Sequence, residues 1–256
     1  MRTRIIGQRF IELPSVDSTN KYAADLLAAG EAVHGTVILA HEQTQGRGQR
    51  GRTWLSAPGL DIATSVVLSL AEWPVADQFA LSKVAALAVH DVVADAMRYH
   101  VDGGTGRVRI KWPNDILVDR KKVAGILIQN EVVGGSVKGV VIGIGLNVNN
   151  SDLDAGLNAT SLRIEIGLPQ DRMALLELLC QRLEHWLDAM LRQDPALDDR
   201  YRELLWSRER FAHFELDGAP MEGRPLDVDR SGRLLVETAD GRVEAFGLDR
   251  LRFAER

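Results

Sequence analysis

Apolar residues in the first part of the chain fall into short runs and one long periodic stretch. The short runs cover residues 10–13, 36–40 and 62–70, and their length and polar boundaries predict strands. The periodic stretch spans residues 77–99, where apolar positions recur every three or four residues, as on the buried face of a helix. A shorter helix is predicted over residues 17–27, after potential N-cap side chains. We therefore expect strands and helices in one domain.

The middle of the chain predicts a strand meander after a turn-rich connection at residues 102–106. Its β-rich runs cover residues 108–112, 116–119, 123–132 and 137–147. The runs are separated by turn residues, which are Pro113-Asn114, Arg120-Lys121 and Gly134-Gly135. Because Lys111, Asp115 and Lys122 each adjoin one of these breaks, we expect the three side chains to cluster near strand ends.

The last third of the chain changes from helices to short β segments. Helices are predicted at residues 172–193 and in part of 197–210. Beyond residue 210, hairpin-type turn signals recur at short intervals; they are Asp217-Gly218, Ser231-Gly232 and Asp240-Gly241. We predict a larger domain over residues 1–209 and a small β-barrel over residues 210–256, too small to bury much core by itself and therefore docked on the larger domain.

Composition narrows the class of protein. The chain has 256 residues, 45% of them hydrophobic, and a net charge of −5, which argues against a broadly basic surface for nucleic acids. One cysteine, Cys180, excludes an internal disulfide and a multi-cysteine metal site, and its apolar helical surroundings predict a core position. No apolar stretch matches a secretion signal or a membrane span, so we expect a cytoplasmic protein without membrane attachment.

Two polar segments carry the candidate chemistry. Residues 46–54, here called the glycine–arginine loop, combine three glycines that allow close approach of backbone N–H groups with three arginines that suit carboxylate and phosphate oxygens. The second segment is Lys-Trp-Pro-Asn-Asp at residues 111–115, and it runs on to Lys122. Either segment alone could be a solvated basic surface or an ordinary turn. Together they indicate a cationic site that faces an anion.

With these segments in view, the chain resembles the biotin protein ligases over nearly its whole length. The matching pieces, in chain order, are residues 18–20, Gln43, residues 46–54, 111–115, 122–127 and 143–148. The resemblance implies an α+β fold: a mixed β-sheet with flanking helices, like that of class II aminoacyl-tRNA synthetases, plus a small C-terminal SH3-like barrel. It also implies ATP-dependent ligation of biotin to a specific lysine of a biotin carboxyl carrier protein, through biotinyl-5'-AMP.

The resemblance also implies two groups of binding residues. The biotin-binding group is Ser18, Thr19, Asn20, Gln43, Arg47, Gly48, Gln49, Lys122 and Gly125. The group for ATP and the adenylate is Arg50, Arg52, Trp54, Lys111, Asn114 and Asn147. In the first group, hydroxyl and amide side chains match the N–H donors and C=O acceptor of the biotin ureido ring.

The chemistry of this reaction explains why charged residues are needed. Because a carboxylate meets the α-phosphate anion against anion, positive charge is required between them, and Lys122 and Arg47 are the leading candidates. Arg50 and Arg52 could neutralise departing pyrophosphate. Mg²⁺ is expected on phosphate oxygens and water rather than in a dedicated protein cage, with Asn147 the nearest candidate contact. No other metal site is predicted.

In the second half-reaction a carrier lysine attacks the acyl carbon. The unperturbed pKa of a lysine is about 10.4, so its amine is mostly protonated at neutral pH. Asp115 is the candidate that accepts or orients the proton, which makes Lys122, Asp115 and Arg47 the predicted catalytic residues.

Plainer interpretations of the same residues remain open at this point. Residues 18–20 could only cap a helix, and Asp115 could only cap the turn before it. Lys122 could be a solvated hairpin tip, although the apolar residues that follow it favour an inward position. Trp54 and Trp112 could be core aromatics. The glycines at 143–145 lack the third glycine of a dinucleotide fingerprint and instead favour close approach to a ligand or strand.

Two departures from the family pattern matter. The position of Gln49 is often arginine in the bacterial proteins, where it helps retain the adenylate, so we hypothesise that this chain releases biotinyl-adenylate more readily. Only about ten residues precede the first predicted strand, so we expect no N-terminal DNA-binding domain and a chain that is a ligase only.

Two rival functions and three open questions remain from the sequence. A lipoate-type acyl-protein ligase would use the same chemistry with another acyl pocket. A nucleic-acid-binding module would use the glycine–arginine loop and show strong salt dependence, which the acidic balance disfavours. The sequence leaves a homodimer open, along with the identity of the carrier and the order of the loop before ligand binding.

Overall fold

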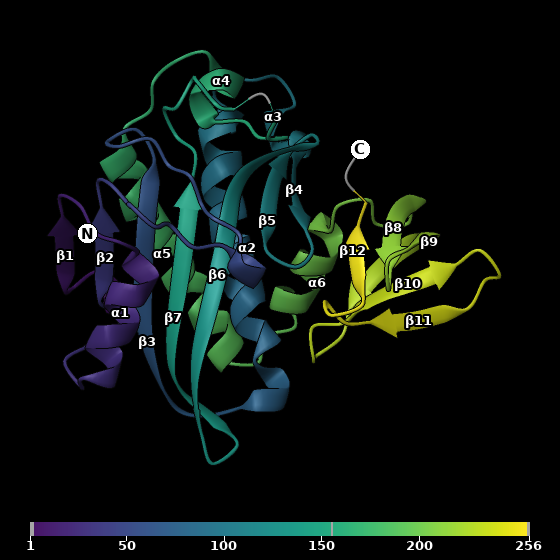
Figure 1. Ribbon diagram of the computed structural model, residues 1–256, viewed down its shortest axis with the longest axis horizontal. Coiled ribbons are helices and arrows are strands. Elements are labelled where there is room, and N and C mark those ends of the chain that lie inside the picture. Colours follow the sequence, from purple (N-terminus) through teal and green to yellow (C-terminus); the bar gives the residue numbers. More distant parts are fainter. Residues whose placement is uncertain (1–2, 155, 255–256) are drawn as a thin grey trace.

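The computed structural model describes residues 3–154 and 156–254 of the chain. They form two β-sheets, a large seven-stranded one flanked by helices and a five-stranded one near the C-terminus (Figure 1). The smaller sheet lies beside the helical flank of the larger unit, next to α6 (Ala196–Leu204). This confirms the expectation of a mixed α and β fold with a separate C-terminal β region.

The large sheet is mixed, with strand order β1-β2-β3-β7-β6-β5-β4. β1 pairs with β2 in parallel and every other neighbouring pair in this sheet is antiparallel. The strands are β1 (Phe10–Leu13), β2 (Val37–Ala40), β3 (Ile62–Pro74), β4 (Val108–Lys111), β5 (Asp115–Val118), β6 (Lys121–Val133) and β7 (Ser136–Leu146). The meander predicted from the sequence is thus β4 to β7.

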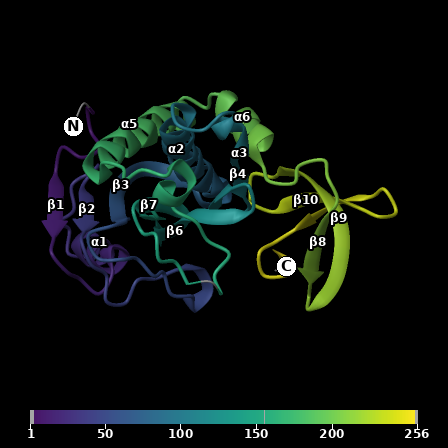
Figure 2. The same ribbon diagram turned by 90° about the horizontal axis from the view of Figure 1, so that it is seen from above.

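Helices cover the large sheet on both faces (Figure 2). The two long helices, α2 (Phe79–Arg98) and α5 (Arg172–Leu191), pack together on one face and form the main core with the sheet. α1 (Thr19–Ala28) lies on the opposite face, where Ala23 packs on a smaller cluster of strand residues. Cys180 on α5 is fully buried, and burial raises the pKa of its thiol to about 12, as expected for a core cysteine.

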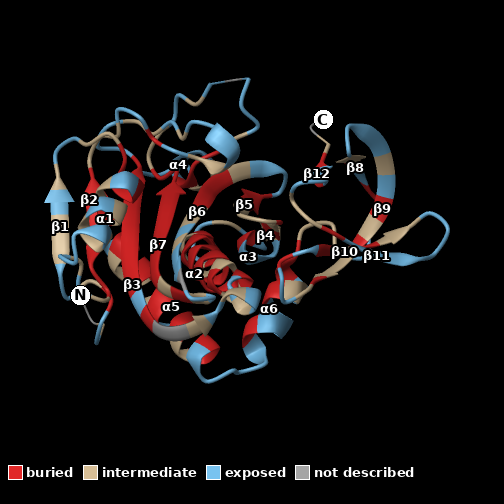
Figure 3. Cartoon of the chain, turned by 60° about the horizontal axis from the view of Figure 1, so that its bottom comes forward, coloured by how far each residue is buried: buried red, intermediate tan, exposed pale blue. Residues whose placement is uncertain are grey.

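Alternation along the central strands gives the two faces different characters. Side chains point alternately to opposite faces of a strand. On β6 and β7, Ile126 and Ile144 are paired and belong to the main core, while their neighbours Gly125 and Gly145 are paired on the face that α1 covers. Figure 3 shows the buried central strands of the large sheet against α2. The glycines leave space on the opposite face.

The small sheet has the order β11-β10-β9-β8-β12, and every pairing in it is antiparallel. Its strands are β8 (Ala212–Leu216), β9 (Ala219–Val228), β10 (Leu234–Thr238), β11 (Val243–Phe246) and β12 (Leu251–Phe253). All three predicted turns connect consecutive strands. Among the described residues the pairings leave β11 and β12 as edges, so the sheet is open rather than a closed barrel.

Some elements differ from the sequence-based expectation. β3 continues to Pro74, four residues beyond its predicted end, because it pairs with β7 over this extension. The connection expected at residues 102–106 includes a one-turn helix, α3 (Gly104–Arg107). A second short helix, α4 (Leu162–Ile166), was not predicted, since its start is fixed by the Ser161 side chain accepting from Ile164 N rather than by an apolar period.

Two single-turn 3-10 helices, η1 (Gln49–Gly51) and η2 (Val75–Asp77), complete the described elements. No helix among residues 3–154 and 156–254 combines the length and the apolar character that a bilayer crossing requires.

Candidate active site

The N-terminus of α1 begins a buried polar network on the face that this helix covers. Gln43 Oε1 accepts from Thr19 N at 2.8 Å and from Thr19 Oγ1 at 3.1 Å. Ser18 occupies the N-cap position with extended backbone, but its side chain forms no cap hydrogen bond. All three residues at positions 18–20 are buried, so capping alone does not account for this polar segment.

Ser65 joins this network, although the sequence analysis did not single it out. Its hydroxyl donates to Asn20 Oδ1 at 2.7 Å and lies 2.8 Å from Thr19 Oγ1. Asn20 Nδ2 in turn donates to Leu127 O at 3.2 Å. The signal in the sequence was weak: Ser65 is a hydroxyl residue inside an apolar run that was interpreted as a buried strand.

Gly143 is required where Asn20 crosses the sheet. A Cβ at this position would lie 1.8 Å from Asn20 Oδ1, well inside any van der Waals contact. Gly143 pairs with Ser65 on β3 and with Leu127 on β6, the two residues that bond Asn20. The glycines expected to allow close approach therefore do so for a side chain of the site itself.

Trp54, at the end of the glycine–arginine loop, lies on a floor of two paired glycines. A Cβ at Gly145 would be 2.2 Å from Trp54 Cε2, and one at Gly125 would be 3.0 Å from Trp54 Cζ3. A backbone hydrogen bond joins the two ends of the loop, since Trp54 N donates to Gly46 O at 3.0 Å. Trp54 is partly exposed and packs on the site face, whereas Trp112 is a buried core residue.

Lys122 and Asp115 form an ion pair at the edge of this glycine floor. Lys122 Nζ lies 2.7 Å from Asp115 Oδ1 and 5.3 Å from the centroid of a Trp54 ring. Asp115 Oδ1 is buried and forms no well-directed hydrogen bond, so the ammonium group is its charge partner through proximity. The two side chains retain 33% and 23% of their exposure, which leaves the pair accessible.

Local strand geometry explains why these residues meet. Asp115 starts β5 and is paired with Gly125 on β6, three residues after Lys122. Lys122 is held at its backbone by bonds to the chain after β7: its N–H donates to Asn158 O, and its C=O accepts from Thr160 N, both at 2.9 Å. Lys122 therefore lies at a strand start and is not a free hairpin tip.

The arginines of the glycine–arginine loop are exposed. The backbones of Arg47 and Thr53 form an isolated antiparallel β-bridge, and Gly48 N donates to Arg52 O at 2.7 Å. Arg50 between them has a positive φ of 55°. The pKa of Asp17 is lowered, first by the hydrogen bond from Lys21 and then by smaller effects that include Arg47. The loop thus presents its basic side chains at the outer side of the polar network.

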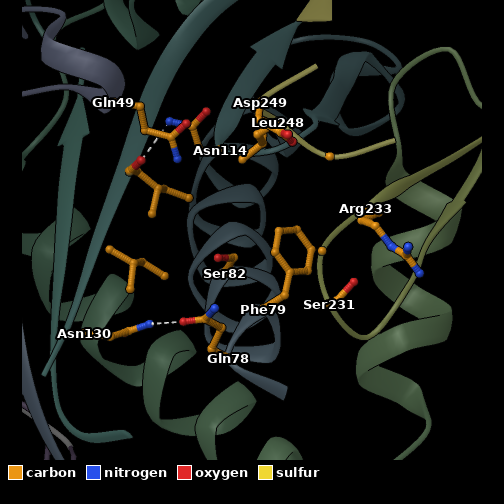
Figure 4. Close-up of a pocket in the computed structure, with 14 residues that line it drawn as sticks. Gln49, Gln78, Phe79, Ser82, Asn114, Asn130, Ser231, Arg233, Leu248 and Asp249 are labelled. Carbon is orange, nitrogen blue, oxygen red and sulfur yellow. Dashed lines mark hydrogen bonds between the residues drawn. The ribbon is translucent and has the colours of Figure 1, made fainter. Parts of the chain in front are cut away.

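Three predicted contacts lie away from the glycine floor. Gln49 and Asn114 line a cavity of about 360 Å³ between the start of α2, β6 and the loops of the small sheet (Figure 4). Asn114 is tied to β6, since its Nδ2 donates to Ile126 O at 2.8 Å. Lys111 Nζ lies 5.6 Å from the Phe253 ring centroid and 5.9 Å from that of Trp206. Its ammonium group therefore faces the small sheet.

The Lys-Trp-Pro-Asn-Asp segment also connects the two sheets. Trp112 Nε1 donates to Gly232 O at 2.9 Å, and Trp206 N donates to Ile110 O at 2.8 Å. The loops of the small sheet are therefore held next to the segment that supplies Asp115.

Asn147 and Asp61 order the far end of the site. Asn147 is buried, and its Nδ2 donates to Thr160 O at 3.0 Å. Asp61, which the sequence analysis did not select, accepts from Ala57 N and Val148 N at 2.9 Å each. Desolvation raises the pKa of Asp61, against the effect of these backbone bonds. The carboxylate joins the end of β7 to the chain that follows Trp54.

No cluster of three or more His, Cys, Asp or Glu side chains suited to a metal ion occurs in the described parts of the chain.

Comparison with known sequences is consistent with this arrangement. The model of the biotin/lipoate A/B protein ligase family matches residues 12–147. The bifunctional ligase/repressor BirA of Bacillus spizizenii is 33% identical, over 97% of this chain and 75% of that protein. The biotin–[acetyl-CoA-carboxylase] ligase of Mycobacterium tuberculosis is also 33% identical, over 93% of this chain and 88% of that protein.

Solved structures show the same fold. The biotin protein ligase of Aquifex aeolicus in complex with biotin and ATP has a TM-score of 0.78 at 24% identity, and the match covers 96% of this chain and all of that one. The Leishmania major biotin protein ligase in complex with biotinyl-5-AMP has a TM-score of 0.65 at 24% identity, with 94% and 99% covered. With a family match over more than half of its length and relatives of this similarity, the chain belongs to the biotin/lipoate A/B protein ligase family.

Proposed function

We propose that this protein is an ATP-dependent ligase that joins biotin to a lysine of a carboxylase carrier domain, through biotinyl-5'-AMP. The observation that carries the proposal is the Lys122–Asp115 ion pair, 2.7 Å long, beside the glycine floor under Trp54. The floor continues along the same sheet face into the polar network around Asn20. The site therefore combines a charged end with a neutral polar end, as a carboxylic acid with a polar ring requires.

The neutral end suits the ureido ring of biotin. Thr19, Asn20, Gln43 and Ser65 offer hydroxyl and amide groups that can both donate and accept. Thr19, Asn20 and Ser65 are buried, and Gln43 accepts from Thr19, so the orientation of the network is set before a ligand arrives. The remaining proposed biotin contacts are Ser18, Arg47, Gly48, Lys122 and Gly125, whereas Gln49 lines the separate cavity beside the small sheet.

The charged end suits the activation of the acid. The biotin carboxylate attacks the α-phosphorus of ATP, a carboxylate–phosphate bond forms, and pyrophosphate leaves with the electrons of the broken P–O bond. Lys122 and the exposed Arg47 of the glycine–arginine loop are the proposed cations that reduce the repulsion between the two anions. Arg50 and Arg52 are proposed to contact the pyrophosphate, and Trp54, Lys111, Asn114 and Asn147 the nucleotide.

The second step transfers the acyl group to the carrier. The amine of the carrier lysine attacks the acyl carbon, the C–N bond forms, and AMP leaves with the electrons of the C–O bond. Asp115 is the group next to Lys122 that can accept the amine proton and pass it to solvent. Because Asp115 Oδ1 is buried without a directed hydrogen bond, it retains acceptor capacity for this role.

Mg²⁺ supplies charge neutralisation on the phosphate oxygens when ATP is bound. The described residues offer no carboxylate cage, so the ion would be held largely by phosphate and water. Asn147 fits a contact through its side-chain oxygen, because its amide nitrogen already donates to Thr160 O.

The finer fold assignment and the partners extend this proposal. The proposal includes a sheet of the class II aminoacyl-tRNA-synthetase type over residues 1–209 and an SH3-like barrel over residues 210–256. The three hairpins of the small sheet support the second assignment, whereas its described strand pairings leave the sheet open. The proposed partner is a biotin carboxyl carrier domain, as the names of the relatives suggest. A ligase without a DNA-binding domain, a homodimer and a cytoplasmic location stay predictions.

The test is ATP–pyrophosphate exchange with biotin, with lipoate or with no acid. We expect exchange that requires biotin and that falls by at least about 100-fold in Lys122→Ala, because that substitution removes the charge between two anions. Lys121→Ala is the matched control, since Lys121 is the exposed neighbour on the same strand. If exchange occurs with lipoate and not with biotin, the proposed substrate changes from biotin to lipoate. If exchange occurs with neither acid, the proposal is overturned.

A further inference from the structure

A second cavity lies on the opposite side of the large sheet from the polar network. It measures about 640 Å³ and is bounded by α2, α3, β4, α5 and α6. The helices that enclose it group together on one side of the sheet, and α1 lies on the other (Figure 2). No residue of the proposed ligase site lines this cavity.

Basic side chains converge on this cavity from four elements. Four arginines line it; they are Arg98, Arg109, Arg182 and Arg200. Three carboxylates line it too; they are Asp91, Asp95 and Glu203. The lining is therefore slightly cationic in a chain that is acidic overall.

The three carboxylates are already engaged by neighbours. Asp95 pairs with Arg182 at 2.7 Å and with Arg98 at 3.2 Å. Glu203 pairs with Arg200 at 3.1 Å.

Asp91 accepts from Trp186 Nε1 at 2.9 Å and lies 3.2 Å from His90 Nδ1.

Arg109 differs from the other three arginines of the lining. Its side chain donates to the backbone oxygen of Val108 at 2.8 Å and pairs with no carboxylate of the described chain. Its charge is available to a ligand.

Two polar atoms of the lining residues are buried without a partner among the described residues. His90 is 2% exposed, and its Nε2 has no hydrogen bond, although the other ring nitrogen faces Asp91. Arg182 Nε is likewise buried and unpaired, while its Nη2 holds Asp95. Both residues line the cavity, but these two atoms are shielded from solvent, so each side chain must rotate before the atom can meet a ligand there.

We propose that this cavity binds a small oxyanion, a phosphate or a carboxylate group, at Arg109, and that Arg182 and His90 rotate to bring their unpaired nitrogens onto it. Guanidinium groups present forked donors that match the oxygens of either anion. His90 Nε2 can accept the hydroxyl hydrogen of a hydrogen phosphate, or donate when the ring carries a second proton. The proposal concerns a site separate from the ligase reaction and does not depend on that reaction.

The test is isothermal titration calorimetry of the full chain with inorganic phosphate and with malonate, in chloride buffer of matched ionic strength. We expect saturable binding of at least one anion, weakened by at least about tenfold in Arg109→Gln. Arg192→Gln is the matched control, because Arg192 is an exposed arginine at the end of α5 outside the cavity lining. The stronger of the two anions identifies the preferred chemistry.

Unfolding of each variant in urea separates binding from stability. We expect Arg109→Gln to keep the wild-type free energy of unfolding, because this side chain bonds only a neighbouring backbone oxygen. Binding of equal strength in wild type and Arg109→Gln would place the anion elsewhere, for instance on the glycine–arginine loop, and would overturn the proposal. Absence of saturable heat for both anions up to about 10 mM would overturn it as well.

Discussion

The two faces of β6 and β7 show how one pair of strands serves two purposes. On the face toward α2 and α5, Ile126 and Ile144 are paired and almost fully buried in the main core. On the other face the neighbouring residues include Gly125, Gly143 and Gly145, and the space above these glycines holds Asn20 and Trp54. The backbone is shared, so the difference arises entirely from side-chain size at alternate positions.

The site depends on the absence of side-chain volume at these glycines as much as on polar chemistry. Large side chains on the core face bury apolar area and fix the position of the strands. On the site face, the space of a missing Cβ is taken by Asn20 at Gly143 and by Trp54 at Gly145. Substitutions on the two faces should therefore separate stability from activity.

The largest effect is expected on the core face. Ile144→Ala leaves a cavity in the main core and should lower the free energy of unfolding by about 2–5 kcal/mol. Urea denaturation measures this loss. Activity per folded molecule in ATP–pyrophosphate exchange should stay near wild type, because Ile144 faces away from the glycine floor. A folded variant without activity would contradict the division of roles between the faces.

A smaller change on the site face should act on activity instead. Gly143→Ala places a Cβ where Asn20 Oδ1 now lies, so Asn20 must move and the polar network must open. We expect biotin-dependent exchange to fall by about 100-fold, as for other small displacements of positioning groups. Gly106→Ala is the control, since an added Cβ there meets no atom within 4 Å. Wild-type exchange in Gly143→Ala would remove Asn20 from the site.

Asp61 connects the chain after Trp54 to the end of β7, and its substitution measures how much this connection contributes to stability. Asp61→Ala leaves the N–H groups of Ala57 and Val148 without their acceptor, which should destabilise the protein by about 1–3 kcal/mol. Asp61→Asn keeps one carbonyl acceptor and should lose less.

The pH dependence of this effect has a defined sign. Because burial raises the pKa of Asp61 in the folded state, the folded protein holds this proton more tightly than the unfolded chain does. The contribution of Asp61 to stability is therefore largest below the ordinary aspartate pKa and declines as pH rises toward the folded value. Urea denaturation of wild type and Asp61→Asn at acidic and neutral pH compares the two slopes; equal slopes would contradict the assignment.

Gln49 should give the smallest effect on the reaction. It lines the cavity beside the small sheet and not the network around Asn20. Under the hypothesis that glutamine retains the adenylate less firmly than arginine, Gln49→Arg should lower release of biotinyl-adenylate severalfold with little change in exchange. Trapping of released adenylate, before and after the substitution, measures this directly. Equal release from both proteins would show that Gln49 has no part in retention.

The strands, long helices and hairpins were predictable because their signals are local. Apolar period, turn residues and glycines at fixed offsets predicted the position of β4 to β7, of α2 and α5 and of all three turns of the small sheet. α4 was missed because a five-residue helix depends on one cap and not on a period. Of the site, the sequence predicted that Lys111, Asp115 and Lys122 cluster near strand ends. Lys122 and Asp115 do lie 2.7 Å apart, whereas the Lys111 ammonium group lies over Trp206 and Phe253.

What the sequence could not show is which residues from distant segments share a face. In the sequence, Asp61 and Ser65 are ordinary polar residues near the start of an apolar run. Only the pairing of β3 with β7 places Ser65 beside Asn20 and Asp61 beside Val148. Gln49, Asn114 and Lys111 carry suitable chemistry, but their direction toward the small sheet depends on how that sheet docks.

The sequence by itself therefore determined the elements, the charged segments and the resemblance that pointed to adenylate chemistry, since these follow from neighbouring residues. The tertiary structure decided that the glycines of β6 and β7 form a floor, that α1 and β3 complete the polar network, and that an arginine-lined cavity lies behind the sheet. The physical reason is that a face exists only when strand register and helix packing bring separate segments together.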